Sequence, residues 1–94
     1  MINAMIIDEK DDVIVAIEPI KQGDEIFYKI NDEEFSLKAL EDIIIYHKVA
    51  IRDILKDTPI NKYGEHIGVA SRDVKKGEHM HTHNISERRE NLKV

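Results

Sequence analysis

The chain has 94 residues, a formal net charge of −5 at pH 7, 35% charged residues and no cysteine. This length can bury one small hydrophobic core, so we expect a single domain over residues 1–94, which excludes a deep cleft between two domains. The lack of cysteine excludes disulfides, thiolate nucleophiles and cysteine-ligated metal sites.

The pattern of charged and apolar residues narrows the classes of partner. Basic residues are interspersed with acidic ones, so no stripe follows a phosphate backbone and we expect no nucleic-acid partner. No apolar run reaches membrane-spanning length, and residues 1–8 lack the pattern of a secretory signal. We therefore expect a cytoplasmic protein with no membrane contact.

Short β-branched runs bounded by turn residues predict four strands, at residues 13–17, 26–30, 49–51 and 67–70. Residues 32–45 begin with acids and are compatible with a short amphipathic helix, although Phe35-Ser36-Leu37 fits a strand equally well. We expect a mainly β, small, barrel-like domain with one short helix as an option. Its core spans about residues 12–85, and the charged tail 86–94 either frays or binds a partner.

An internal repeat connects these strands. Residues 16–26 align without gaps on residues 50–60, and a third copy covers residues 70–80. Each copy has an apolar anchor followed by a turn, whose equivalent position holds Gly23, Asp57 and Gly77. Glycine and aspartate tolerate the positive φ angles of tight turns. The uneven spacing of the copies argues against a solenoid and favours a compact sheet.

Three histidines stand at alternate positions, His79, His81 and His83. In an extended strand their rings would line one face, where imidazoles can bind a divalent metal or transfer protons. His81 and His83 are the pair expected to act together. Thr82 and Asn84 can bind a polyhydroxylated substrate or orient the rings. A solvated strand end without function is the alternative that spacing alone leaves open.

Two other clusters contain side chains capable of chemistry. His47 can act as an acid or a base and Lys48 can pair with a carboxylate, although the residues alone favour an ordinary exposed strand entry. Lys62 and Tyr63 can reach an anionic ligand beside Gly64, which most simply permits a tight bend.

The stretches 47–54, 62–68 and 77–84 together resemble the SAF domain of altronate and galactarate dehydratases, over about residues 12–85. The string Gly-Glu-His-Met-His-Thr-His-Asn is the most specific part. The resemblance implies a β-clip fold, a hydro-lyase reaction on a small sugar acid, and a larger dehydratase-like chain that supplies much of the active site. It also implies a small subunit that is inactive alone, as in two-subunit altronate dehydratases and the similar sulfolactate sulfo-lyase; homo-oligomers are a further option.

The resemblance also implies roles for individual residues. Catalytic roles fall to His47, His81 and His83, substrate binding to Lys48, Lys62, Tyr63, Thr82 and Asn84, and metal ligation to His79 and His81. The metal would be divalent, iron or manganese, and shared with the large chain. The family motif usually has Pro and Gly where this chain has Ile44 and Tyr46, Val where it has Met80, and Gly where it has Asp57. A stand-alone SAF-type module that binds a ligand or partner without catalysis is the competing interpretation.

Overall fold

The computed structural model describes residues 2–6, 8–62 and 65–86. Its strands are β1 (Ala4–Met5), β2 (Val13–Ala16), β3 (Glu25–Ile30), β4 (Glu33–Lys38), β5 (Lys48–Ala50), β6 (Pro59–Lys62), β7 (Glu65–Ala70), β8 (His79–Met80) and β9 (Ile85–Ser86). Over this described part of the chain, no helix has both the length and the apolar character needed to cross a membrane.

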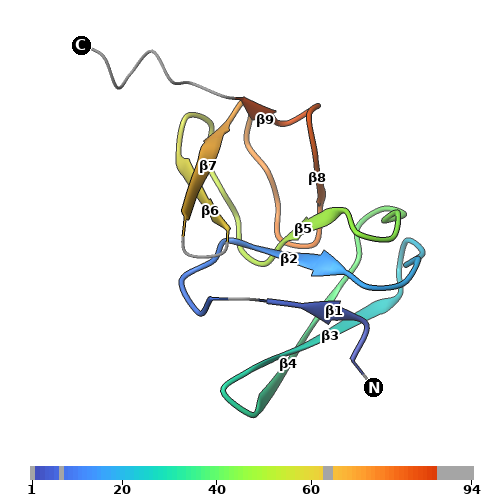
Figure 1. Cartoon of the computed structure of the whole chain (residues 1–94). Helices are drawn as coiled ribbons and strands as arrows, with labels where there is room; N and C mark the ends of the chain where they lie inside the picture. The colour runs from blue at the N-terminus through green and yellow to red at the C-terminus, as the bar shows by residue number, and fades with distance from the viewer. Residues whose placement is uncertain (1, 7, 63–64, 87–94) are drawn as a thin grey trace.

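The strands form three antiparallel sheets, with the orders β1-β2-β5-β8, β6-β7-β9 and β3-β4. The hairpins β3–β4 and β6–β7 lie on opposite sides of the central strands β2 and β5 (Figure 1). The mainly β prediction is confirmed, and the four predicted strands correspond to β2, β3, β5 and β7. Within the described residues the sheets do not close into a barrel.

Two hydrophobic clusters form the core, one on each side of the central strands. Ile14 of β2 and Val49 of β5 belong to the first cluster, which the β3–β4 hairpin covers with Ile26 and Leu37. The second cluster lies against the β6–β7 hairpin and contains Val13, Ala50, Ile54, Ile60, Ala70, Val74 and Met80. Because residues on both faces of β2 are buried, its sequence Val13–Ala16 is a continuous apolar run without polar alternation, and in β5 the same holds for Val49 and Ala50 after the half-buried Lys48.

A further copy of the repeat, the second of four in chain order, occupies residues 39–49, where the sequence pattern is also compatible with a helix. It has the same bend, isolated bridge and turn as the other three copies, and it follows strand β4 directly. The helix interpretation of residues 32–45 is therefore wrong, and the strand alternative is right. The apolar residues in this segment have a spacing similar to that of a helix because strand β4 runs directly into the next turn.

The four copies pair as two couples, 16–26 with 39–49 and 50–60 with 70–80. Anchor residues bridge within each couple, Ile20 with Ile43 and Ile54 with Val74. The backbone N–H at each turn donates to the carbonyl of the first residue of the paired copy. These bonds join Gly23 to Ala39 (2.8 Å), Tyr46 to Ala16 (2.7 Å), Asp57 to Ala70 (2.7 Å) and Gly77 to Ala50 (2.8 Å). The copies are therefore unevenly spaced along the chain because they pair as two reciprocal couples.

Aspartate side chains cap the paired turns. Oδ1 of Asp53 accepts a hydrogen bond from the Lys76 backbone N–H, and Oδ1 of Asp73 accepts one from Lys56, each at 2.8 Å. Asp42 accepts the equivalent bond from Gln22 at 2.8 Å. Three of the four turns therefore have the same carboxylate cap, which satisfies a backbone donor that the turn leaves without a partner.

Gly77 and Gly23 hold equivalent turn positions, with φ of 92° and 91°. Gly77 also packs closely against the end of β4, because a Cβ there would lie 2.3 Å from the Lys38 carbonyl oxygen, whereas a Cβ on Gly23 would meet nothing within 4 Å. The fourth turn thus requires glycine for space as well as for backbone conformation.

This pair of glycines gives a test of that contact. Gly23→Ala should lower the free energy of unfolding by about 1–2 kcal/mol, the cost of an L-residue in left-handed conformation. Gly77→Ala should cost at least about 2 kcal/mol more, since backbone must also shift. Urea unfolding of both variants measures the difference, and equal losses would show that the contact at Gly77 is not tight.

The end of the described chain extends the second hairpin sheet. Strand β9 pairs with β7, which places Ser86 opposite Val69. Ser86 is therefore part of the sheet and not of a fraying tail. Residues 87–94, the remainder of the expected tail, lie outside the described residues.

Candidate functional site

Histidines from two turns meet where β5 and β8 pair. His47 leaves the second turn immediately before β5, and His79 begins β8, opposite Val49. Nδ1 of His47 and Nε2 of His79 are 2.8 Å apart, a hydrogen bond in which one ring donates and the other accepts. The His47 ring also stacks on His81, with centroids 4.3 Å apart.

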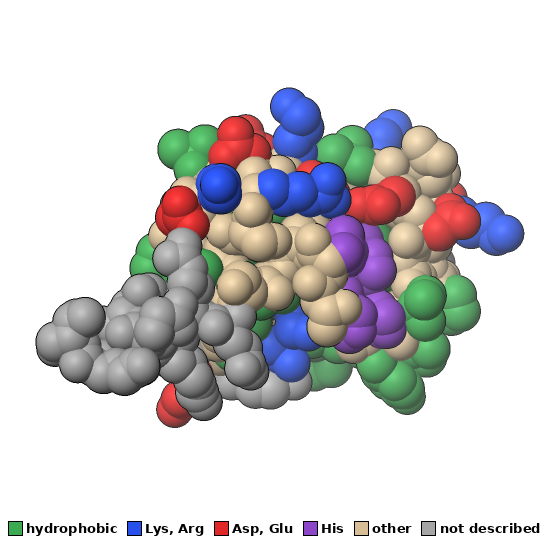
Figure 2. All heavy atoms as spheres, turned by 90° about the horizontal axis from the view of Figure 1, so that it is seen from above, with side chains coloured by type: hydrophobic (Ala, Val, Ile, Leu, Met, Phe, Trp, Pro, Cys, Tyr) green, Lys and Arg blue, Asp and Glu red, His purple; other side chains and the backbone are tan. Residues whose placement is uncertain are grey.

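The fourth histidine joins this group through His79. The rings of His79 and His83 have centroids 5.1 Å apart and are tilted by 37°. Figure 2 shows the histidine side chains gathered in one patch of the surface. The grouping differs from the expected pair of His81 and His83, because the chain turns after Met80 and the alternation of an extended strand ends there.

Asn84 holds the turn that carries the histidines. Its side chain is fully buried, accepts a hydrogen bond from the His81 backbone N–H at 2.9 Å and donates one to the His79 carbonyl at 2.9 Å. Both bonds go to backbone groups, so Asn84 holds the backbone that carries His79 and His81, and its role toward a substrate stays a prediction. Glu41, which no sequence motif indicates, accepts a hydrogen bond from the His79 backbone N–H at 3.0 Å.

A cavity of about 260 Å³ adjoins the histidine group. It is lined by Lys48, Lys62, Ile67, His81, Thr82 and Ile85. Four residues selected from the sequence, two lysines, a histidine and a threonine, thus meet at one cavity. Burial, and next the nearby charge of Lys62, lower the pKa of Lys48 below its usual value. Two adjacent ammonium groups and apolar walls suit an anionic group on a small ligand.

The environment of His79 and His81 lowers their pKa values and so favours the neutral imidazole. Burial lowers the pKa of His79 below 6.5, and the neighbouring rings of His83 and His47 act in the same direction. Desolvation, followed by the effects of His47 and Lys48, lowers the pKa of His81. Near neutral pH the group therefore contains imidazoles able to accept a proton.

A metal site is not complete in this arrangement. Among the described side chains, no group of three or more His, Asp or Glu residues is placed to hold a metal ion. The His79 Nε2 is also engaged by His47. The described residues alone therefore do not fit a metal cofactor, and ligation by His79 and His81 together with another chain stays a prediction. Tyr63 lies outside the described residues.

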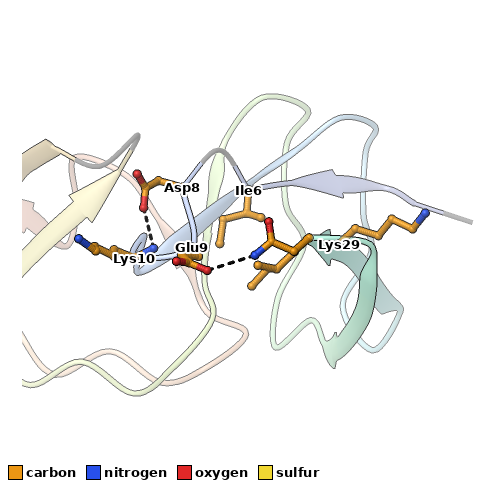
Figure 3. A pocket seen from close by; sticks show the side chains of 7 residues that line it. Ile6, Asp8, Glu9, Lys10 and Lys29 are labelled. Carbon is orange, nitrogen blue, oxygen red and sulfur yellow. Dashed lines mark hydrogen bonds between the residues drawn. The ribbon is translucent and has the colours of Figure 1, made fainter.

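A second hollow, of about 390 Å³, lies between the segment before β2 and the β3–β4 hairpin. Its polar groups pair with one another, Glu9 with the Asn31 amide at 3.2 Å and Asp8 with the Lys10 backbone N–H at 2.8 Å (Figure 3). None of the residues selected from the sequence lines it. The histidine group with its cavity is therefore the candidate site.

Residues 2–88 match the family described as altronate/galactarate dehydratase SAF domain. The chain belongs to this family. The resemblance seen in the sequence is therefore confirmed, and the match covers all four copies of the turn as well as the histidine group. This SAF domain is related to lyases, as the following two kinds of relative show.

Two kinds of relative contain this SAF domain in different contexts. This chain is 32% identical over 88 residues to (2R)-sulfolactate sulfo-lyase subunit alpha of Chromohalobacter salexigens, and the match covers 89% of this chain and 94% of that one. It is 36% identical over 78 residues to altronate dehydratase of Bacillus subtilis, covering 83% of this chain and 15% of that one. The matching altronate dehydratase of Escherichia coli is 35% identical over 74 residues, 14% of its length. The SAF domain thus spans a small part of the dehydratases and nearly all of a lyase subunit.

Removal of the Asn84 side chain should destabilise the turn that carries His79 and His81. Asn84→Ala leaves the His81 N–H and the His79 carbonyl without these partners, so we expect a loss of about 3 kcal/mol in the free energy of unfolding. Thr82→Ala, at a neighbouring exposed position, is the control and should cost less than about 0.5 kcal/mol. Chemical denaturation measures both variants, and similar small losses would contradict the role of Asn84.

The lowered histidine pKa values predict how stability depends on pH. The unfolded chain binds protons near pH 6.5, whereas folded His79 and His81 bind them only at lower pH. The stability these rings contribute is therefore present above about pH 6.5 and is lost as pH falls through the lowered values.

NMR titration of the imidazole C–H signals, in the presence of a chelator, measures this effect. Both rings should titrate below pH 6.5 in the folded chain and near 6.5 in concentrated urea. Midpoints at or above 6.5 in the folded chain would show that the rings are not desolvated.

Proposed function

We propose that this chain is the small subunit of a sugar-acid dehydratase of the altronate/galactarate type, a hydro-lyase. In this proposal it contributes the histidine-rich part of the active site to a larger chain and is inactive alone. The observation that carries the proposal is the stacked group of His47, His79 and His81 beside a cavity lined by Lys48 and Lys62.

The two lysines suit the carboxylate that every sugar acid carries. Lys48 and Lys62 face the same cavity, and the pKa of Lys48 is lowered by burial and by the charge of Lys62. A bound carboxylate would relieve this repulsion and so bind more tightly than a neutral group. The ammonium groups would also stabilise the negative charge that develops on that carboxylate when the neighbouring carbon loses a proton.

The histidines suit the two proton transfers of a dehydration. One group must take the proton next to the carboxylate, and another must protonate the departing β-hydroxyl so that it leaves as water. His81 lines the cavity and stacks on His47, which is hydrogen-bonded to His79. A proton accepted at His81 would then have to pass to the departing hydroxyl or to solvent, with the hydrogen-bonded rings of His47 and His79 beside it. His83, which contacts His79, is the further candidate for acid or base.

The size and position of the cavity support a second chain. Its volume of about 260 Å³ is below the range of about 300–1,000 Å³ found for complete ligand pockets. Relatives contain this domain either within a longer dehydratase or as a subunit alpha of a lyase. A large dehydratase-like chain would complete the pocket and any metal-ligand set. Sulfolactate is the second substrate to assay, because a relative is a sulfolactate sulfo-lyase subunit.

Affinity capture tests the subunit assignment. The tagged chain, purified under native conditions from its source cells, should retain a large dehydratase-like chain that mass spectrometry identifies. The captured complex should then release water from altronate or galactarate. Capture of no such chain would contradict the subunit assignment and favour a stand-alone binding module.

Substitutions in the assembled enzyme should separate chemistry from binding. His81→Ala should lower kcat by about 10²- to 10⁴-fold, because it removes a proton-transfer group. Lys48→Met should raise KM for the sugar acid at least tenfold, as expected for the loss of a charge-assisted contact. Lys56→Met is the control, since Lys56 is an exposed lysine on the third turn, and it should leave both constants unchanged. Wild-type constants in the His81 and Lys48 variants would contradict the site assignment.

A further inference from the structure

The second turn differs in chemistry from its three counterparts. The tips of the other turns are polar or mixed, Lys21-Gln22-Gly23, Leu55-Lys56-Asp57 and Lys75-Lys76-Gly77. The second has Ile44-Ile45-Tyr46 instead, with Ile44 59% and Tyr46 71% exposed. Four turns with one backbone geometry serve as internal controls for one another. The geometry of the turn therefore does not require apolar side chains at the tip.

Tyr46 is also an unfavourable residue for its backbone position. Its φ is 72°, the left-handed region, where two of the equivalent turns have glycine. A bulky L-residue there costs about 1–2 kcal/mol relative to glycine. A side chain that is 71% exposed recovers little of this cost by burial within the chain. Since the stability of the isolated chain does not account for Tyr46, a contact with another molecule is the better explanation.

The apolar tip lies directly beside the candidate site. Tyr46 precedes His47, and the His47 backbone N–H closes the turn on the Ile44 carbonyl at 2.9 Å. Hydrophobic side chains are visible next to the histidine patch in Figure 2. Any molecule that covers Ile44 and Tyr46 therefore lies over the edge of the histidine group.

We propose that Ile44 and Tyr46 dock this chain onto its large lyase chain, with the Tyr46 ring entering an apolar pocket of that chain. This inference rests on the proposed function and adds the surface through which the partner binds. Aromatic residues beside an incomplete site are typical anchors of interfaces. A second copy of this chain fits less well, because a symmetric contact through this turn would set two histidine patches against each other and occupy the side that the large chain must reach.

Matched serine substitutions test the docking surface. Ile44 and Leu55 hold the same position in the second and third turns, with similar exposures of 59% and 67%. The dissociation constant of the chain from the purified large dehydratase-like chain of the source genome is measured by calorimetry. Ile44→Ser should weaken binding about tenfold or more, and Leu55→Ser should leave it unchanged. Equal effects of the two substitutions would overturn the proposal.

Tyr46→Gly should change stability and affinity in opposite directions, which a purely structural role of Tyr46 would not produce. Removal of the side chain relieves the positive-φ strain, so the thermal unfolding midpoint of the free chain should rise. The same substitution should weaken binding to the large chain about tenfold to a hundredfold. Asp57→Gly, at the equivalent position of the third turn with φ of 69°, should leave the affinity unchanged. Wild-type affinity in Tyr46→Gly would overturn the docking role of the ring.

The outcomes separate this inference from the proposed function. A wild-type chain that binds the large chain, with variants that bind equally well, overturns the docking surface alone. A wild-type chain that does not bind the large chain overturns both the subunit assignment and the docking surface. Self-association that Ile44→Ser abolishes, measured by analytical ultracentrifugation, would assign the surface to a second copy and overturn the choice of partner.

Discussion

Reciprocal pairing of the turns is the constraint on which the rest of the structure depends. Each turn N–H donates to the first carbonyl of its partner copy, and the Gly77 N–H thereby binds the Ala50 carbonyl of β5 at 2.8 Å. The Ala50 N–H in turn donates to the Glu78 carbonyl at 3.0 Å. These bonds set the register of β8 on β5, which brings His79 next to His47 from 32 residues away. The candidate site is thus a direct product of the repeat.

The same constraint explains why so small a chain can position a polar cluster. The strands β2 and β5 are buried on both faces by the two hydrophobic clusters, so the strand that carries Lys48 has little freedom to shift. Asn84 and Glu41 then fix the backbone around His79 and His81. The rings themselves stay at the surface, beside a shallow cavity, where a second chain can reach them. Rigidity in the framework and incompleteness in the pocket are both expected of a subunit.

Much of this arrangement could be predicted from the sequence, and the exceptions have physical causes. The first, third and fourth turns are recognisable in the sequence because glycine or aspartate marks the position of positive φ, whereas the second turn is not, because Tyr46 stands at that position. The string of histidines indicated a site, but the grouping of His47 with His79 depends on strand register, which local patterns do not encode. Glu41 acts through one bond to the backbone, a role that no sequence motif signals.

We propose that this chain supplies part of an active site that only a second chain completes. The most direct test of this proposal is a titration of activity, in which the purified large dehydratase-like chain at fixed concentration receives increasing amounts of this chain, with altronate, galactarate or sulfolactate as substrate. We expect no turnover from either chain alone and a rate that rises to a plateau at a fixed stoichiometric ratio. Full turnover by the large chain alone would contradict it.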